Sequence, residues 1–445
     1  MTALGAPLSA QTLSEALEGA YQNNPSIQIA RSSLLGADED VAAALAAAGP
    51  QVNANASGNQ TRSFETDTNA ESWSVDITAT QNIYAGGRAL LGIQAAELAN
   101  LSARQDVIDI EQNVLLAAVQ AFMDVRRDSD VVRLNQNTVR VLNEQLRAAN
   151  DRFEVGEVTR TDVSQTEARL AAARATLEAT RGQFNVSRET YRATIGGYPT
   201  SLFEPSGLPS LPQSADQAED IAINSHPRML SAQFDQTAAE LGLEIARRAL
   251  RPTITGSVSL QRSNPVTSNN SSDSGSIGIQ GSIPIYQSGA LNSDIRAAAA
   301  DLNAAKSALQ LAALTTKQSV RSAYANWQAS VASIGASDEQ VRAARIAFDG
   351  VSEEASLGAR TTLDVLDAEQ ELRNAQSNLI SAKRDEVVAR FSVLAEMGQL
   401  TAEKLNLNVA YFDPVENYNE VTGANSKLGQ RRNQLLDKIL ERSGN

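Results

Sequence analysis

The segment at residues 72–88, SWSVDITATQNIYAGGR, returns in related form at residues 274–290 as SGSIGIQGSIPIYQSGA. In both segments apolar and polar residues alternate before a tyrosine and a glycine turn, the period-two pattern of a strand with two different faces. A Pro-free, Gly-poor stretch follows each segment, over about Arg88–Glu154 and Ala290–Ala355. At about 1.5 Å per residue, each stretch predicts a helix of roughly 100 Å, which is too long for a globular domain.

The two segments belong to a repeat that runs through most of the chain. An offset of 202 residues aligns turn and cap residues without a gap, from Pro25 on Pro227 to Gly196 on Gly398. Proline and glycine mark the ends of elements, so the shared marks indicate two copies of one series of elements. The aligned pairs between these limits are Pro50/Pro252, Tyr84/Tyr286, Gly87/Gly289, Gly156/Gly358, Asp162/Asp364 and Val163/Val365.

This repeat predicts how the chain is organised. Residues 1–10 are a remnant of a signal peptide, ending in Leu8-Ser9-Ala10, or an ordinary flexible start. The first repeat covers 11–200, a linker 201–224, the second repeat 225–400, and a final segment with a basic tail 401–445. Each repeat is expected to contain a helix, two strands, a long helix and a returning helix. The expected shorter helices are 25–48 and 227–250, the strands 52–60, 72–84, 254–260 and 277–285, and the exposed hairpin loops 62–71 and 262–275.

The returning helices carry apolar residues at a spacing of seven, which is typical of helices packed as in a coiled coil. The first series is regular, whereas the second is broken only at Glu386. We interpret both series as helix packing. They are Val163, Leu170, Leu177, Phe184 and Tyr191, and then Val365, Leu372, Leu379 and Val393.

Composition narrows the function classes. Apolar residues make up 42% of the chain but aromatic residues only 4%, which favours slender helical bundles over a bulky core. The net charge of -14 argues against a nucleic-acid partner. There is no cysteine, no phosphate-binding loop, no metal-spaced cluster and no nucleophile constellation, so we predict no cofactor and no enzyme activity. The single histidine, His226 before Pro227, is interpreted as a helix-start residue.

Four strands are too few to close a transmembrane barrel, and no apolar run is long enough for a transmembrane helix. If the strands cross a membrane, several chains must pool them, because open strand edges cannot face lipid. Trp73, Val75 and Ile77 would then face lipid, while Asp76 and Thr78 face water. A soluble sandwich is the alternative for the strands, and a coiled-coil filament or surface-layer protein is the alternative for the whole chain.

From about Gln11 to Tyr418, the sequence resembles the TolC family of outer-membrane efflux and secretion channel proteins. The order and spacing of several short stretches carry the resemblance: Asn24-Pro25, residues 84–88 (YAGGR), 152–156 (RFEVG), 225–227 (SHP), 284–289 (PIYQSG) and 357–367 (LGARTTLDVLD). It implies a mainly α fold with a small β part, in which three chains share a twelve-stranded barrel in the outer membrane of a Gram-negative bacterium. A long helical barrel would cross the periplasm, and residues 207–220 and those after Thr401 would form an equatorial belt.

The resemblance also identifies a candidate gate. The residues matching Asp364 and Asp367 would project into the periplasmic mouth, where crowding should raise some of their pKa values and attract cations. Thr361 with Asp364, like Thr159 with Asp162, also forms a helix-capping pattern. Asp367 lies three residues beyond Asp364 on the same helical face, and the repeat does not explain its charge, because its counterpart in the first repeat is the neutral Gln165.

The resemblance further implies a latch that holds the gate and partners that use it. Arg360 would pair with Asp162, but Ala355 replaces the family tyrosine of this latch, so one hydrogen-bonding partner is absent and we expect the closed state to be held differently or more weakly. The partners implied are a periplasmic adaptor at the helix tips near Gly156 and Gly358 and an inner-membrane transporter of the ABC or RND type. The sequence leaves open whether the exported substrate is a drug, another small toxic compound or a protein.

Overall fold

A computed structural model describes residues 11–65, 67–265 and 271–423, which divide into two compact units. Unit 1 contains residues 11–30, 107–229 and 313–412, and unit 2 contains the other described residues. The predictions for residues 1–10 and for the tail beyond Gly423 lie outside the described residues. In the described part of the chain no helix is both long and apolar enough to cross a bilayer.

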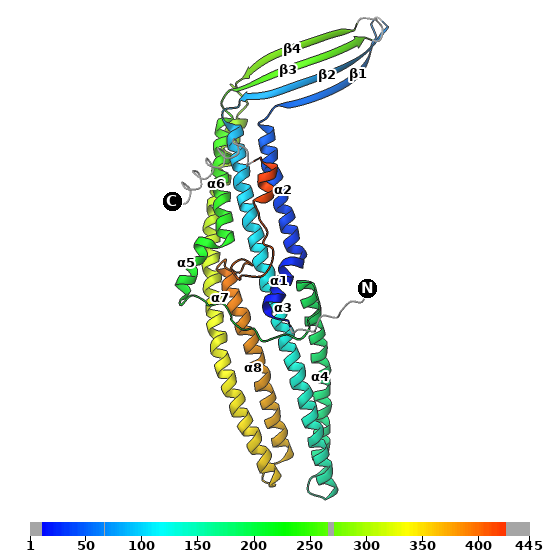
Figure 1. Ribbon diagram of the computed structural model, residues 1–445, viewed down its shortest axis with the longest axis vertical. Coiled ribbons are helices and arrows are strands. Elements are labelled where there is room, and N and C mark those ends of the chain that lie inside the picture. Colours follow the sequence, from blue (N-terminus) through cyan, green and yellow to red (C-terminus); the bar gives the residue numbers. More distant parts are fainter. Residues whose placement is uncertain (1–10, 66, 266–270, 424–445) are drawn as a thin grey trace. The chain divides into compact units, whose positions relative to one another are not determined.

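The order of elements repeats, which confirms the internal duplication (Figure 1). A helix, two strands, a 67-residue helix and a returning helix occur in each copy. In the first copy these are α2 (Pro25–Ala47), β1 (Gln51–Ser63), β2 (Thr68–Tyr84), α3 (Arg88–Glu154) and α4 (Arg160–Ile195). In the second they are α6 (Pro227–Arg248), β3 (Thr253–Pro265), β4 (Ser272–Ser282), α7 (Ala290–Ser356) and α8 (Thr362–Glu396). The other helices of the described residues are α1 (Leu13–Asn23), α5 (Ala215–Ser225) and α9 (Glu416–Val421).

The strands form one antiparallel sheet in unit 2, in the order β1-β2-β3-β4 (Figure 1). The register places apolar side chains opposite one another on one face and small polar side chains on the other. On the polar face Ser57 bonds Ser74 and Ser259 bonds Ser276, each at 2.8 Å. The predicted alternation therefore extends across all four strands, but the apolar face ends at Arg262 and Asp273, which lie on it with Arg262 opposite Val75. The apolar face comprises Val52, Ala54, Ala56, Trp73, Val75, Ile77, Ala79, Ile254, Val258, Leu260, Ile277 and Ile279.

The prediction of long hairpin loops at 62–71 and 262–275 was wrong, because the strands continue into them. Gln60 pairs with Glu71 and Arg62 with Asn69 in the ladder. Backbone hydrogen bonds extend a strand whatever the polarity of its side chains, and polar pairs across the strands support them. At its other end β4 stops at Ser282, short of the predicted end, and Pro284 has no N–H to continue the ladder.

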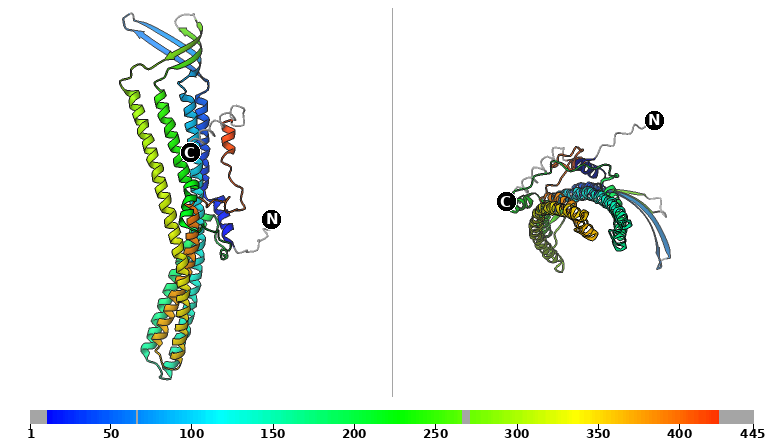
Figure 2. Two further views of the ribbon diagram at one scale, coloured as in Figure 1. Left: turned by 90° about the vertical axis from the view of Figure 1, so that its left-hand side faces the viewer. Right: turned by 90° about the horizontal axis from the view of Figure 1, so that it is seen from below.

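In unit 1, α8 packs against α3 and α7. Arg384 of α8 forms an ion pair with Asp124 of α3 at 2.8 Å. Glu386, the break in the apolar series, is buried and accepts hydrogen bonds from Arg390 at 2.6 Å and from Trp327 of α7 at 3.3 Å. Figure 1 and Figure 2 show α7 and α8 running side by side. A buried charge at this position is tolerated because it is paired.

The returning helices end against the starts of α2 and α6 in the same way in both copies. Gly196 has φ +97°, and a Cβ built on it would lie 2.9 Å from Asn23. Gly398 has φ +70°, and a Cβ there would lie 2.8 Å from the backbone of His226. His226 is buried, and its Nδ1 accepts a hydrogen bond from the N–H of Arg228 at 3.1 Å. It therefore occupies a helix start, as its sequence position predicts.

Candidate functional site

The candidate gate residues lie near the turns that join α3 to α4 and α7 to α8. Gly156 and Gly358 take left-handed conformations, with φ +80° and +77°. After each glycine a backbone N–H donates across the turn, from Glu157 to the carbonyl of Arg152 and from Ala359 to that of Glu354, both at 2.9 Å. Glycine adopts this conformation at no steric cost, so both helices reverse through the same kind of turn.

Asp162 and Asp364 cap the helices that follow these turns. Asp364 Oδ2 accepts hydrogen bonds from the N–H of Thr361 at 3.0 Å and from its hydroxyl at 2.9 Å. Asp162 accepts the same two bonds from Thr159, both at 2.8 Å. The predicted capping is therefore confirmed for both copies.

The electrostatic surroundings of Asp364 favour its charged form. The hydrogen bonds from the backbone and hydroxyl of Thr361 lower the pKa of Asp364, and the positive charge of Arg360 lowers it further. The predicted rise in pKa depends on carboxylates from other chains, so it stays a prediction for the assembly. Within one chain, Asp364 is a carboxylate at neutral pH.

Asp367 has a partner that the sequence analysis missed. Its Oδ1 lies 2.7 Å from Nη2 of Arg169 on α4, so the ion pair joins the first repeat to the second. One sequence signal points to this pair. The offset of 202 aligns Arg169 with the acidic Glu371, just as it aligns Asp367 with Gln165, so both partners depart from the repeat.

The chain by itself does not bring together the two latch residues. Nε of Arg360 lies 2.8 Å from Oε2 of Glu354, which precedes the turn on α7. This hydrogen bond and the charge of Glu354 raise the pKa of Arg360. Among the described residues no ion pair joins Arg360 to Asp162. Their pairing, which neighbouring chains could supply, stays a prediction.

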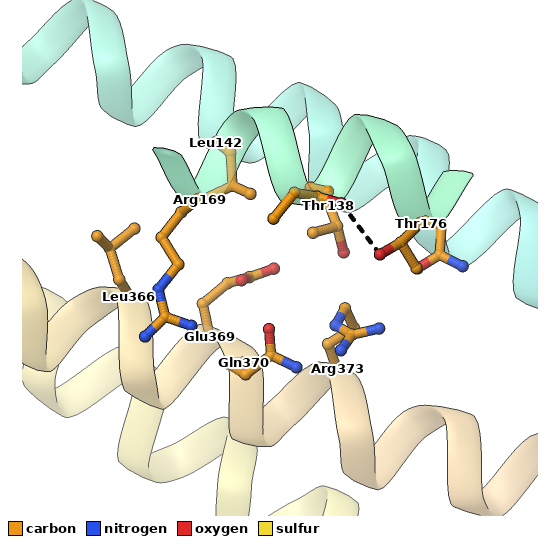
Figure 3. A pocket seen from close by; sticks show the side chains of 11 residues that line it. Thr138, Leu142, Arg169, Thr176, Leu366, Glu369, Gln370 and Arg373 are labelled. Carbon is orange, nitrogen blue, oxygen red and sulfur yellow. Dashed lines mark hydrogen bonds between the residues drawn. The ribbon is translucent and has the colours of Figure 1, made fainter. Parts of the chain in front are cut away.

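A small cavity of about 80 Å³ lies between α3, α4 and α8 next to the Arg169–Asp367 pair (Figure 3). Glu369 of α8 lines it and is only 9% exposed. Burial raises the pKa of Glu369, while Thr138, Arg373 and Arg169 oppose that rise. Drug-sized ligands need pockets of about 300 Å³ or more, so the cavity is too small to be a substrate site.

Leu366 closes the cavity on the side of the turn. It is 2% exposed and packs against Leu142 of α3 and Leu170 of α4. In Figure 3, Arg169 extends from α4 toward α8 beside Leu366 and Glu369. In the described ranges no group of three or more histidine or acidic side chains is placed to hold a metal ion. The site is therefore one of charge pairs and helix packing.

Comparison with known proteins places these features in a family. The family described as "Outer membrane efflux protein" matches residues 16–197 and 220–399. The efflux protein BepC of Brucella suis biovar 1 (strain 1330) is 35% identical over 92% of this chain and 90% of its own length. TolC of Escherichia coli (strain K12) is 27% identical over 91% of this chain and 86% of its own. The crystal structure of the outer membrane protein VceC of Vibrio cholerae superimposes with a TM-score of 0.75 and 20% identity, covering 87% of this chain and 96% of that one. The chain therefore belongs to the outer membrane efflux protein family.

Proposed function

We propose that three copies of this outer-membrane export channel close around one duct with a gate at its periplasmic mouth. The two-faced sheet carries the proposal. In the described chain β1 and β4 each pair on one side only, while the apolar face is exposed at Val258, Ile277 and Ile279. Twelve pooled strands would satisfy the open edges and set the apolar face against lipid. The Ser, Thr and Asn face would then line a wet lumen.

The gate would be a ring of carboxylates from Asp364 and Asp367. Both residues follow the turn at Gly358, and the side chain of Asp367 is exposed. Six carboxylates around one constriction would favour cations and repel anions. The pKa of Asp364, lowered by its hydrogen bonds, would help the ring keep its charge at neutral pH.

The partners would be a periplasmic adaptor and an inner-membrane transporter of the ABC or RND type. Val155 and Leu357, beside Gly156 and Gly358, are exposed apolar side chains at the helix tips, and these would contact the adaptor. The duct would be passive and have no enzyme activity, so the transporter would supply the energy. Because BepC is named an efflux protein, we favour drugs and other small toxic compounds as substrates, with proteins as further cargo.

The carboxylate ring is tested by replacing Asp364 and Asp367 with alanine together. Single-channel recordings in planar bilayers should show weaker cation selectivity and loss of block by hexaamminecobalt(III) added on the periplasmic side. Alanine at Asp385, an exposed acid far along α8 that pairs with Arg384, serves as the control. Block that survives in the double variant would exclude these residues as the ring.

The latch is tested by replacing Arg360 with serine, which should raise conductance by favouring an open mouth. The Glu354→Gln variant identifies the relevant partner. If the contact with Glu354 holds the mouth shut, both variants should raise conductance equally. If Arg360 acts through Asp162 of a neighbouring chain, Glu354→Gln should leave conductance unchanged. Unaltered conductance in Arg360→Ser would show that the latch lies elsewhere.

A further inference from the structure

The pair of Arg169 and Asp367 is the link between the two repeats that lies closest to the proposed carboxylate ring. It joins α4 of the first repeat to α8 of the second, at 2.7 Å between Nη2 and Oδ1. Arg169 is 42% and Asp367 59% exposed, so both side chains remain accessible to water and ions. An ion pair of this exposure is screened by water and salt and contributes little to stability, so it can exchange partners.

The pair depends on how α8 lies against α4. Leu366, which precedes Asp367 in the sequence, is buried in one cluster with Leu142 of α3 and Leu170 of α4. One turn further along α8, the buried Glu369 faces Arg169, Arg373 and Thr138 (Figure 3). Since Arg169 and Asp367 stand on different helices, any movement that lifts Leu366 out of this packing also separates the two charges.

Asp364 does not share this dependence. Its carboxylate is bonded to Thr361 at the start of its own helix, and nearby Arg360 is engaged with Glu354. The bonds of Asp364 to Thr361 lie within the start of α8 and would move with it, whereas Arg360 reaches back to Glu354 on α7. The two carboxylates of the proposed ring therefore differ. Asp364 keeps its bonds to Thr361 wherever α8 lies, whereas the charge of Asp367 is offset by Arg169 only while α8 packs on α4.

We propose that Arg169 controls how tightly the mouth binds multivalent cations. While α8 packs on α4, Arg169 pairs with Asp367 and offsets its negative charge. When the two helices separate, Asp367 becomes available to cations. This inference rests on the proposed carboxylate ring and adds its regulation. A multivalent cation and Arg169 compete for the same carboxylate, so their effects are reciprocal. Packing of α8 on α4 weakens cation binding, and bound cation favours separation of the helices.

Arg169→Gln tests this role in planar-bilayer recordings with hexaamminecobalt(III) as the probe. Removing one positive charge per chain beside the ring should tighten block by about fivefold or more at low salt, since the attraction of a trivalent ion to nearby carboxylates is then no longer offset. Conductance should rise as well, because α8 loses a contact that holds it against α4. In the variant that also carries Asp367→Asn, the tightening should disappear.

A matched control and a charge exchange separate this role from general damage to the fold. Arg174 lies on the same helix but bonds Asn143 within the first repeat, so Arg174→Gln should leave block and conductance unchanged. Exchanging the charges, with Arg169→Asp and Asp367→Arg together, should return conductance toward that of the unaltered protein. The exchange should not restore block by hexaamminecobalt(III). Unchanged block in Arg169→Gln, while Asp367→Asn weakens it, would overturn the inference and leave the ring intact. Block that is insensitive to Asp364 and Asp367 themselves would instead overturn the proposed function.

Discussion

At the scale of single residues, Glu369 is an acid placed where a neutral group would fit better. It is buried between α3, α4 and α8, and burial raises its pKa. A carboxyl group whose pKa is higher in the folded than in the unfolded chain stabilises the fold below its unfolded pKa, which is about 4.3 for glutamate. This contribution is lost as pH rises through the folded pKa, so at neutral pH Glu369 costs stability.

Glu369→Gln should therefore make the protein more stable at pH 7 and reduce the loss of stability between acidic and neutral pH. Thermal unfolding of the detergent-solubilised protein between pH 4 and pH 8 measures both effects. Glu371→Gln is the control, because Glu371 lies on the same helix but is exposed. A lower melting temperature at pH 7 in Glu369→Gln alone would mean that the ionised carboxylate stabilises this packing.

Residue patterns predict local contacts better than distant ones. The capping by Asp162 and Asp364 follows from a threonine three positions earlier, so the sequence contains both partners within one helical turn. Arg169 and Asp367 are 198 positions apart, and their contact depends on which faces of α4 and α8 meet. Burial of Glu369 was likewise not predicted, because charged residues are mostly exposed.

At the scale of elements, the close contact at Gly398 fixes the end of α8 against the start of α6. Gly398→Ala would force a Cβ to 2.8 Å from His226 Cα and the Ser225 carbonyl, at φ +70°. We expect a loss of about 1–3 kcal/mol, measured as a lower melting temperature and a lower yield of folded protein. Gly335 lies exposed within α7 with open space around its Cα, so Gly335→Ala should instead be neutral or stabilise by up to about 1 kcal/mol. Equal effects of the two substitutions would argue against the close contact.

Elements were predicted well wherever their ends carry a chemical signal. Proline and glycine set the limits of α2, α3, α6 and α7 to within a few residues. The far ends of the strands carry no such signal. Polar residues such as Arg62 and Asp273 suit a loop and an exposed strand equally, so the hairpins were predicted too long and the strands too short.

At the scale of the whole molecule, the two faces of the sheet should differ in their response to charge. Ile279 and Gln280 are neighbours on β4 but lie on opposite faces. Ile279→Arg would place a charge against lipid, which costs about 2–4 kcal/mol near the middle of a bilayer, whereas Gln280→Arg would point into the wet lumen. Only Ile279→Arg should reduce the amount of heat-modifiable trimer in outer-membrane fractions. Equal loss in both variants would contradict the assignment of the faces.

Copies of this chain, as we propose, assemble into an export duct with an acidic mouth. The most direct measurement is single-channel recording of the purified full chain in planar bilayers. We predict discrete, cation-selective openings that hexaamminecobalt(III) blocks from the side bearing the helix tips. A purified protein that inserts without conductance, or that conducts anions in preference to cations, would contradict the account.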